Sequence, residues 1–188
     1  MITMQSLPIQ TSRAMTEPRD SHRFQWFFMA LVMLLASLAC LAGCAVKPAA
    51  RTGEKAPEIA GTDLHGEPVS LARLRGRVVV VCFWTNSCCG DRLKRLEPYY
   101  RQNKDKGLAI LAINEGNAGE NVASYAEANG LTFTVQTDEG GLWAREYGVF
   151  GFPTIFIIDR KGIIRKKILG DTAPEQLDEL VRQIASLH

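Results

Sequence analysis

Hydrophobic residues along this chain fall into runs that predict different secondary-structure elements. Residues 78–84, VVVVCFW, form a continuous apolar run rich in β-branched side chains, which is typical of a central strand buried on both faces. Residues 107–114, GLAILAIN, predict a second buried strand, and residues 132–138, TFTVQTD, predict a shorter one. Residues 154–170, TIFIIDRKGIIRKKILG, hold two further apolar runs around a Lys-Gly pair, which predicts two strands joined by a turn.

Segments with helical periodicity separate these predicted strands. In residues 89–105 the apolar side chains of Leu93, Leu96 and Tyr100 recur at helical spacing, with cations on the other side. Residues 173–188 predict an amphipathic C-terminal helix with a proline in its first turn. The remaining predicted elements are helices at residues 121–130 and 141–148 and a hairpin at residues 63–71. Alternation of strands and helices, followed by a β-hairpin and a final helix, predicts an α/β sandwich.

The N-terminal segment has the pattern of an export signal. An apolar run at residues 26–41 follows Arg23 and ends in LAGC, so that small residues precede Cys44. The run is short for a transmembrane helix but suits the hydrophobic part of a secretory signal. LAGC resembles the lipobox of bacterial lipoproteins, which implies that residues 1–43 are a signal peptide and that the Cys44 sulfur carries the lipid. An uncleaved anchor and ordinary signal cleavage near Ala45 are the alternatives.

The segment after Cys44 predicts how the domain is attached. Residues 44–55 are small and polar with one proline, so we expect a lipidated tether there and a folded domain at residues 56–188. Such a protein would be extracytoplasmic, in the periplasm, and anchored to a bacterial membrane. Ala45 is not an acidic retention signal, which favours the outer membrane.

Composition is consistent with one globular domain in an oxidising compartment. The chain has 188 residues, of which 46% are hydrophobic and 22% charged, and its formal net charge is +2. No basic stripe stands out, which argues against a nucleic-acid partner. Cys40 would be lost with the signal and Cys44 would carry the lipid. The cysteines left for thiol chemistry are Cys82, Cys88 and Cys89.

Two sequence signatures bracket the predicted domain. Residues 53–88, GEKAPEIAGTDLHGEPVSLARLRGRVVVVCFWTNSC, and residues 147–164, YGVFGFPTIFIIDRKGII, resemble the two signatures of TlpA/ResA-type thioredoxin-like proteins. The resemblance implies an α/β thioredoxin fold, with a central mixed sheet flanked by helices and an N-terminal β-hairpin extension. It also implies a cis peptide bond before Pro153. The substrate-binding surface that it implies consists of Trp84, Phe152, Pro153 and Thr154.

Cysteine chemistry is the function that this resemblance implies, although the motif departs from the usual C-x-x-C. Cys88 stands at the nucleophile position, at a helix N-terminus where the helix dipole favours the thiolate. Asp91 replaces the second cysteine, and its negative charge opposes ionisation of the thiol. We therefore expect thiol–disulfide exchange through a single nucleophilic cysteine, with mixed disulfides that persist until an external thiol, or slowly Cys89, resolves them. The candidate catalytic residues are Cys88, Cys89 and Asp91.

Cys89 leaves two interpretations open. It could form a disulfide with Cys88, although adjacent Cα atoms, about 3.8 Å apart, are closer than the ~4.4–6.8 Å that is usual for disulfides. Alternatively, it is an ordinary first-turn cysteine that faces away from Cys88. Cys82 lies within the first buried strand, so we expect it to be a small core hydrophobe. Glu97, in the following helical segment, is expected to be a solvated charge.

Two other function classes fit parts of the sequence. The spacing of Thr85 and Cys88 resembles the peroxiredoxin core, which implies a one-cysteine thiol peroxidase. A non-catalytic binding module that keeps the groove beside Pro153 is the other alternative, so the sequence leaves enzymatic activity open. No metal-ligand set is visible, so no cofactor is expected and copper binding is a minor alternative. The expected partners are thiols or disulfides of exported proteins or a small thiol, with the chain itself a monomer.

Overall fold

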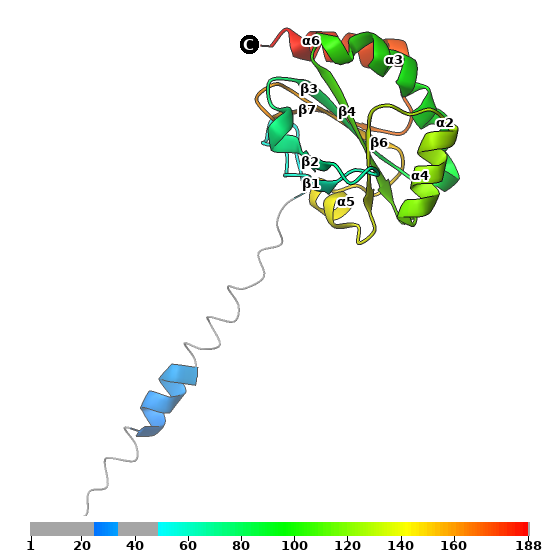
Figure 1. Ribbon diagram of the computed structural model, residues 1–188. Coiled ribbons are helices and arrows are strands. Elements are labelled where there is room, and N and C mark those ends of the chain that lie inside the picture. Colours follow the sequence, from blue (N-terminus) through cyan, green and yellow to red (C-terminus); the bar gives the residue numbers. More distant parts are fainter. Residues whose placement is uncertain (1–24, 34–48, 188) are drawn as a thin grey trace, which may run out of the picture. The chain divides into compact units, whose positions relative to one another are not determined.

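A computed structural model describes residues 25–33 and 49–187 (Figure 1). The chain divides into two compact units, Met1–Val46 and Lys47–His188. In the first unit, residues 25–33 form a helix with exposed side chains. None of the described helices is both long and apolar enough to cross a membrane. Cys44 lies outside the described residues, so signal cleavage and lipidation there stay predictions.

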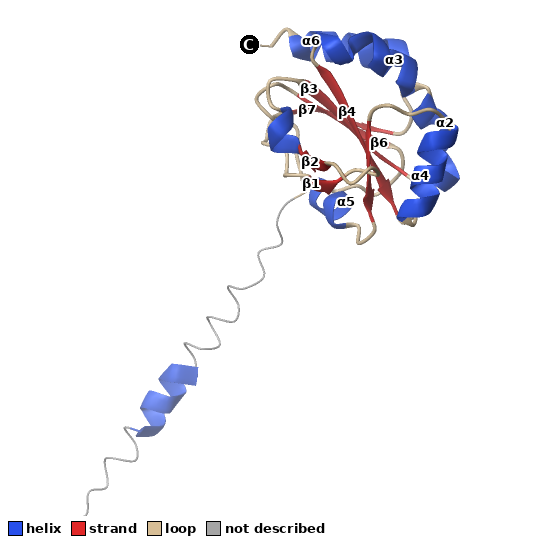
Figure 2. Ribbon diagram, viewed as in Figure 1, coloured by secondary structure: helices blue, strands red, loops and turns tan. Residues whose placement is uncertain are grey.

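A five-stranded mixed sheet forms the centre of the second unit (Figure 2). Its strands, in the spatial order β5-β4-β3-β6-β7, are β3 (Val78–Trp84), β4 (Leu108–Glu115), β5 (Thr134–Asp138), β6 (Thr154–Ile158) and β7 (Ile164–Leu169). β3, β4 and β5 are parallel, β6 is antiparallel to β3, and β7 is antiparallel to β6. The end of β3 therefore lies beside the start of β6, and both border the predicted redox site.

Helices and a small hairpin complete the fold. The helices are α2 (Asn86–Lys94), α3 (Leu96–Asn103), α4 (Gly119–Ala128), α5 (Leu142–Tyr147) and α6 (Pro174–Ala185), with short 3-10 turns at Leu71–Leu74 and Lys104–Lys106. The predicted N-terminal hairpin is formed by β1 (Ala60–Thr62) and β2 (Pro68–Ser70). Its turn is stabilised by Asp63 Oδ1, which accepts hydrogen bonds from the backbone N–H groups of His65 and Glu67. The expected thioredoxin-like fold with an N-terminal hairpin is confirmed.

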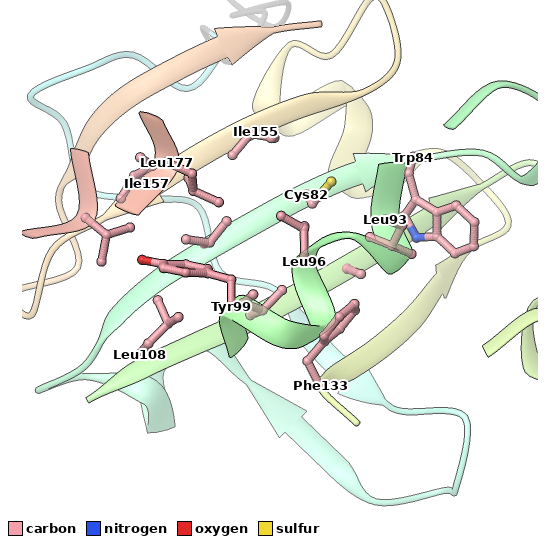
Figure 3. Packing of buried hydrophobic residues seen from close by; sticks show 14 of the residues in the cluster. Cys82, Trp84, Leu93, Leu96, Tyr99, Leu108, Phe133, Ile155, Ile157 and Leu177 are labelled. Atoms are coloured by element: carbon pink, nitrogen blue, oxygen red, sulfur yellow. The ribbon is translucent and has the colours of Figure 1, made fainter. Parts of the chain in front are cut away.

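The continuous apolar run of β3 places side chains on both faces of the sheet, as expected for a central strand. Val78, Val80, Cys82 and Trp84 face one buried cluster, with side chains from α2, α3, α4 and α6 (Figure 3). The alternate residues face a second cluster, with side chains from α5 and the N-terminal hairpin region. Cys82 is 3% exposed and occupies the core position predicted for it.

The segment predicted as one helix at residues 89–105 contains a break. α2 ends at Lys94, and α3 begins at Leu96. Pro98 explains the position of this break, because proline lacks the N–H that would bond to the Lys94 carbonyl and its ring clashes with that carbonyl. The break changes the direction of the chain between the cysteine-bearing turn and the helix that packs on α6.

The segment just before the predicted domain start at Ala56 is hydrogen-bonded to the domain. The backbone N–H of Gly53 donates to the Ile164 carbonyl at 2.7 Å, and the Ile164 N–H donates to the Glu54 carbonyl at 2.9 Å. Ala50 N–H also donates to the Glu146 carbonyl, at 3.1 Å. The last part of the segment predicted as a tether is therefore hydrogen-bonded to the domain, because its backbone groups find partners beside β7 and α5.

Candidate active site

The cysteine pair lies in the first turns of α2, directly after the end of β3. Thr85 is the extended residue that precedes the helix, and the helix begins at Asn86. Asn86 ties this turn to the end of β4, because its side-chain oxygen accepts a hydrogen bond from Asn114 Nδ2 at 2.9 Å. The Asn86 N–H donates to Asn117 Oδ1 at 3.1 Å. These bonds hold the helix start, and with it Cys88, in place.

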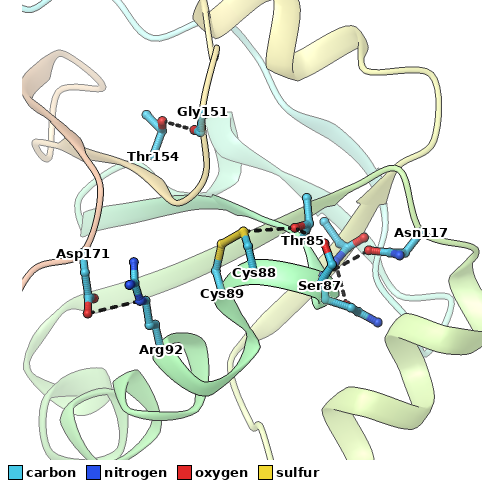
Figure 4. The surroundings of a disulfide bond; sticks show 11 residues. Thr85, Ser87, Cys88, Cys89, Arg92, Asn117, Gly151, Thr154 and Asp171 are labelled. Carbon is cyan, nitrogen blue, oxygen red and sulfur yellow. Dashed lines mark hydrogen bonds and ion pairs between the residues drawn. A yellow bond between two sulfur atoms is a disulfide. The ribbon is translucent and has the colours of Figure 1, made fainter.

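Cys88 and Cys89 are joined by a disulfide between adjacent residues (Figure 4). Of the two interpretations of Cys89, the structure therefore has the bonded pair. The two cysteines differ in access, because Cys88 is exposed whereas Cys89 is only 2% exposed. Thr85 Oγ1 lies 3.2 Å from Cys88 Sγ, within hydrogen-bonding reach of the sulfur. A molecule in solution can approach the sulfur of Cys88, whereas Cys89 belongs to the core.

The loop before β6 lies beside this pair. The peptide bond between Phe152 and Pro153 is cis. Pro153 and Cys89 line a common small cavity of about 20 Å³, and Phe152 is partly buried against both core clusters. The loop that holds Phe152 and Pro153 therefore lies next to Cys89, and its role in substrate binding stays a prediction.

Two residues predicted to bind substrate, Trp84 and Thr154, have buried side chains. Trp84 is fully buried and packs on Tyr125 with 5.1 Å between ring centroids. Thr154 is also fully buried, and its hydroxyl donates to the Gly151 carbonyl at 2.6 Å. Both side chains face the core in this structure, so a substrate-binding role of these two residues stays a prediction. Trp84 lies in the same core cluster as Cys89 and Leu93 of α2, and the Thr154 hydroxyl stabilises the loop before Pro153.

Charged residues divide the surroundings of the cysteine pair into two sides. The side chain of Asp91 is 98% exposed, with Lys94 Nζ 4.0 Å away. Burial, and to a smaller extent the negative charge of Asp91, raises the pKa of Tyr125 on α4. Asp91 does not line the cavity that Cys89 shares with Arg92 and Arg95. On the other side, Arg92 Nε and Arg95 Nη2 lie 3.4 Å and 2.9 Å from the same oxygen of Asp171. Sequence patterns had not indicated Asp171, which follows β7 in a loop.

Glu97 is not the solvated charge that the sequence predicted. It is 7% exposed and accepts hydrogen bonds from Arg101 Nε at 2.6 Å, Thr132 N at 2.8 Å and Thr132 Oγ1 at 2.5 Å. Burial alone would raise the pKa of Glu97, but the Thr132 hydrogen bonds and the Arg101 guanidinium outweigh it and hold the pKa below its usual value. Glu97 therefore joins α3 to the segment before β5.

Cys82, the third cysteine of the domain, is a buried free thiol of low reactivity. Burial, with a smaller contribution from the charge of Asp171, raises the pKa of Cys82 to about 12. A thiol with this pKa stays protonated near neutral pH, and the thiolate is the nucleophilic form. In the part of the chain that the structure describes, no group of three or more histidine, cysteine or acidic side chains is arranged to hold a metal ion.

Comparison with known proteins gives the family. The model of the AhpC/TSA family matches residues 52–167, which is more than half of the chain. The chain belongs to the AhpC/TSA family. Among relatives in this family, the thiol-disulfide oxidoreductase ResA of Bacillus thuringiensis subsp. konkukian (strain 97-27) is 32% identical over 134 residues, covering 70% of this chain and 78% of ResA. ResA of Geobacillus thermodenitrificans (strain NG80-2) is 33% identical over 140 residues, which cover 73% of this chain and 80% of that ResA.

Solved structures agree with this membership. The crystal structure of a candidate thiol:disulfide interchange protein DsbE from Chlorobium tepidum has a TM-score of 0.67 and 28% identity, covering 72% of this chain and 99% of that one. The fold of this AhpC/TSA chain is therefore that of thioredoxin-like proteins.

Proposed function

We propose that this protein carries out thiol–disulfide exchange, with Cys88 as the nucleophilic cysteine that meets the substrate and Cys89 as its resolving partner. Family membership and the ResA relatives support thiol-disulfide oxidoreductase activity as the class. The single observation that carries the proposal is the bonded pair, in which one sulfur is accessible and the other is in the core. This pairing favours resolution by Cys89 over the persistent adducts expected from the sequence.

The reduced protein would act in two exchange steps. The Cys88 thiolate attacks one sulfur of a substrate disulfide, forms a mixed disulfide, and releases the other substrate sulfur as a thiolate. The Cys89 thiolate then attacks Cys88 Sγ, forms the adjacent disulfide, and releases the second substrate thiolate. The two protons of the protein dithiol end on the two substrate thiols. An external thiol reductant that attacks the exposed Cys88 sulfur reverses these steps and regenerates the dithiol.

Local groups act on Cys88 in opposite directions. Thr85 Oγ1, 3.2 Å away, can donate a hydrogen bond to the thiolate, and the N-terminus of α2 supplies a positive dipole end. Asp91, three residues on, opposes ionisation by its negative charge. We propose that Asp91 modulates the reactivity of Cys88 but takes no part in the exchange of sulfur atoms, because a carboxylate cannot form the second disulfide.

Trapping of the mixed disulfide tests the proposal. Cys89→Ser, treated with glutathione disulfide, should accumulate one glutathione adduct on Cys88, because the second step is removed. The wild-type dithiol should instead pass to the adjacent disulfide without accumulating an adduct, and Cys88→Ser should form none. Mass spectrometry of intact protein and peptides distinguishes these species. Absence of any Cys88 adduct in Cys89→Ser under excess disulfide would refute the proposal and favour a non-catalytic binding module.

A thiol peroxidase is the second candidate, favoured by the contact of Thr85 Oγ1 with Cys88 Sγ. In that reaction the Cys88 thiolate takes the terminal oxygen of a hydroperoxide and releases an alcohol or water. The Cys88 sulfenic acid then condenses with the Cys89 thiol, which forms the adjacent disulfide and releases water. Peroxide consumption by the dithiol protein, compared with its rate of exchange with glutathione disulfide, decides between the two candidates.

We also propose that the domain acts outside the cytoplasm on thiols and disulfides of exported proteins or on a small thiol. In this proposal residues 1–43 are removed and Cys44 carries a lipid that anchors the domain to a bacterial membrane, with the outer membrane favoured. The wild type should then partition into detergent, whereas Cys44→Ser should be found in the aqueous phase, since several acyl chains on one residue hold a protein firmly. Unmodified Cys44 in wild-type protein isolated from its native host would refute the anchor.

A further inference from the structure

The cationic side of the cysteine pair has the chemistry to recognise part of the substrate. We propose that Arg92 and Arg95 bind a carboxylate of the substrate, so that the protein prefers disulfides with a negative charge close to the reacting sulfur. This inference rests on the proposed exchange at Cys88 and names the substrate class for that same site. The carboxylate could belong to an acidic side chain of a protein or to a small thiol such as glutathione.

Arg92 lies on α2, and Arg95 directly follows the last residue of α2. Both side chains reach Asp171 in the loop after β7. Arg92 is one helical turn after Cys88, and Arg95 is three residues further on. Arg92, Arg95 and Asp171 line the same cavity of about 20 Å³ as Cys89 and Pro153. Figure 4 shows Arg92 and Asp171 beside the disulfide. Because residues four apart on a helix are neighbours, a substrate held at Cys88 has Arg92 next to it, with Arg95 and Asp171 beyond.

The cluster keeps binding capacity for a second carboxylate. Two guanidinium groups share one oxygen of Asp171, which leaves one net positive charge on the three side chains. A guanidinium has five N–H donors in a planar fork that suits a carboxylate. The side chains of Arg92 and Arg95 are 44% and 55% exposed, so much of their donor surface faces solvent. A substrate carboxylate can join Asp171 or replace it.

The negative charge of Asp91 determines where on the substrate a carboxylate increases the rate of exchange. Asp91 does not line the cavity that Arg92, Arg95 and Pro153 share, and its side chain is 98% exposed. A negative group on the substrate would be repelled there and attracted on the Arg92 side. The preference should therefore be orientation-dependent: a carboxylate helps only when the bound substrate directs it toward Pro153 and Arg92.

Exchange rates with three small disulfides of different charge test the inference. The substrates are anionic dithiodipropionate, neutral bis(2-hydroxyethyl) disulfide and cationic cystamine, and the rate is that of mixed-disulfide formation in Cys89→Ser. We expect the anionic substrate to react about fivefold faster than the neutral one, the effect of one close charge pair in water. The preference should shrink with added salt. Arg92→Gln with Arg95→Gln should abolish the difference in rate between the anionic and the neutral substrate.

Two further variants separate recognition from a structural role of the cluster. Asp171→Asn removes the competing carboxylate and should increase the preference for the anionic substrate, which loss of structure would not do. Arg101→Gln, a matched loss of one exposed arginine on α3, should leave the preference unchanged. Equal slowing of all three substrates in the arginine variants, or an anionic preference that survives in them, would overturn the inference.

The outcomes also separate this inference from the proposed function. Exchange with all three disulfides but without a charge preference overturns only the inference. No adduct with any of them overturns the proposed function and the inference together. Peptide disulfides with Glu, Gln or Lys beside the cysteine, compared with glutathione disulfide, identify the source of the carboxylate. Faster exchange of the Glu peptide supports an acidic protein segment, and faster exchange of glutathione disulfide alone supports a small thiol.

Discussion

Replacing Glu97 by glutamine changes one atom and should nevertheless destabilise the domain. The carboxylate of Glu97 receives three donors, one from Arg101 and two from Thr132. Glutamine offers a single acceptor oxygen and an NH₂ group, so at least one donor would face another donor. Hydrogen bonds to charged groups contribute roughly 1.5–3 kcal/mol, and we expect Glu97→Gln to lower the free energy of unfolding by about 2 kcal/mol. That loss corresponds to a decrease in Tm of roughly 5 °C.

The effect should depend on pH with a definite sign. The pKa of Glu97 is lower in the folded state than its usual value, so the folded state binds this proton less readily than the unfolded state. The stabilisation is therefore complete above the unfolded-state pKa of about 4.3 and is lost as the pH falls through the folded-state pKa. The stability difference between wild type and Glu97→Gln should be large at neutral pH and should shrink in acid.

Urea unfolding of both proteins across this pH range measures the difference directly. Arg101→Gln is the matched control, because the Arg101 side chain is 58% exposed and such pairs contribute at most about 1 kcal/mol. It should cost clearly less than Glu97→Gln, since the two Thr132 hydrogen bonds remain. Equal stability of Glu97→Gln and wild type at neutral pH would refute the reasoning, as would a difference that does not change in acid.

Two further changes probe the helix that carries the cysteines. A Cβ at Gly90 would lie 2.8 Å from Tyr125 Cε2, so Gly90→Ala should lower the Tm because overpacking of roughly 1–3 kcal/mol exceeds the gain of about 1 kcal/mol in helix propensity. Thermal unfolding checks this, and combining the change with Tyr125→Leu should restore stability; a higher Tm of Gly90→Ala alone would contradict the packing argument. Asp91→Cys restores a C-x-x-C pair with Cys88 and should raise turnover of a protein disulfide several-fold in a dithiothreitol-coupled assay. Asp91→Ser is its control, and equal rates of these two variants would show that the added thiol is not used.

The spacing of hydrophobic residues in the sequence predicts most of the strands and helices, because the side chains at those positions form the core. The apolar run at β3 predicts a strand buried on both faces, and the helical spacing after it predicts the segment that became α2 and α3. The assignment of Trp84 to the substrate surface came from family resemblance. The same apolar run placed the residue in the core, which is where it lies.

Interactions between distant residues are what the sequence could not show. Glu97 stands among charged residues on a helix, and nothing near it indicates that Thr132 supplies two donors from 35 positions away. Asp171 lies in a loop without periodicity, and only the return of β7 brings it to Arg92 and Arg95. For the adjacent cysteines, the sequence allowed both a bonded pair and separate thiols. Their state depends on side-chain placement in the first turns of α2.

The outer edge of β7 has a consequence for how this domain meets unfolded chains. Extended peptides readily add as an extra strand to an open sheet edge. Here the first residue of β7 is already bonded to Gly53 and Glu54, and the next residues are three consecutive cations, Arg165, Lys166 and Lys167. Both features oppose strand addition. The β7 edge is therefore protected against the addition of a further strand, and with it against edge-to-edge aggregation of the domain.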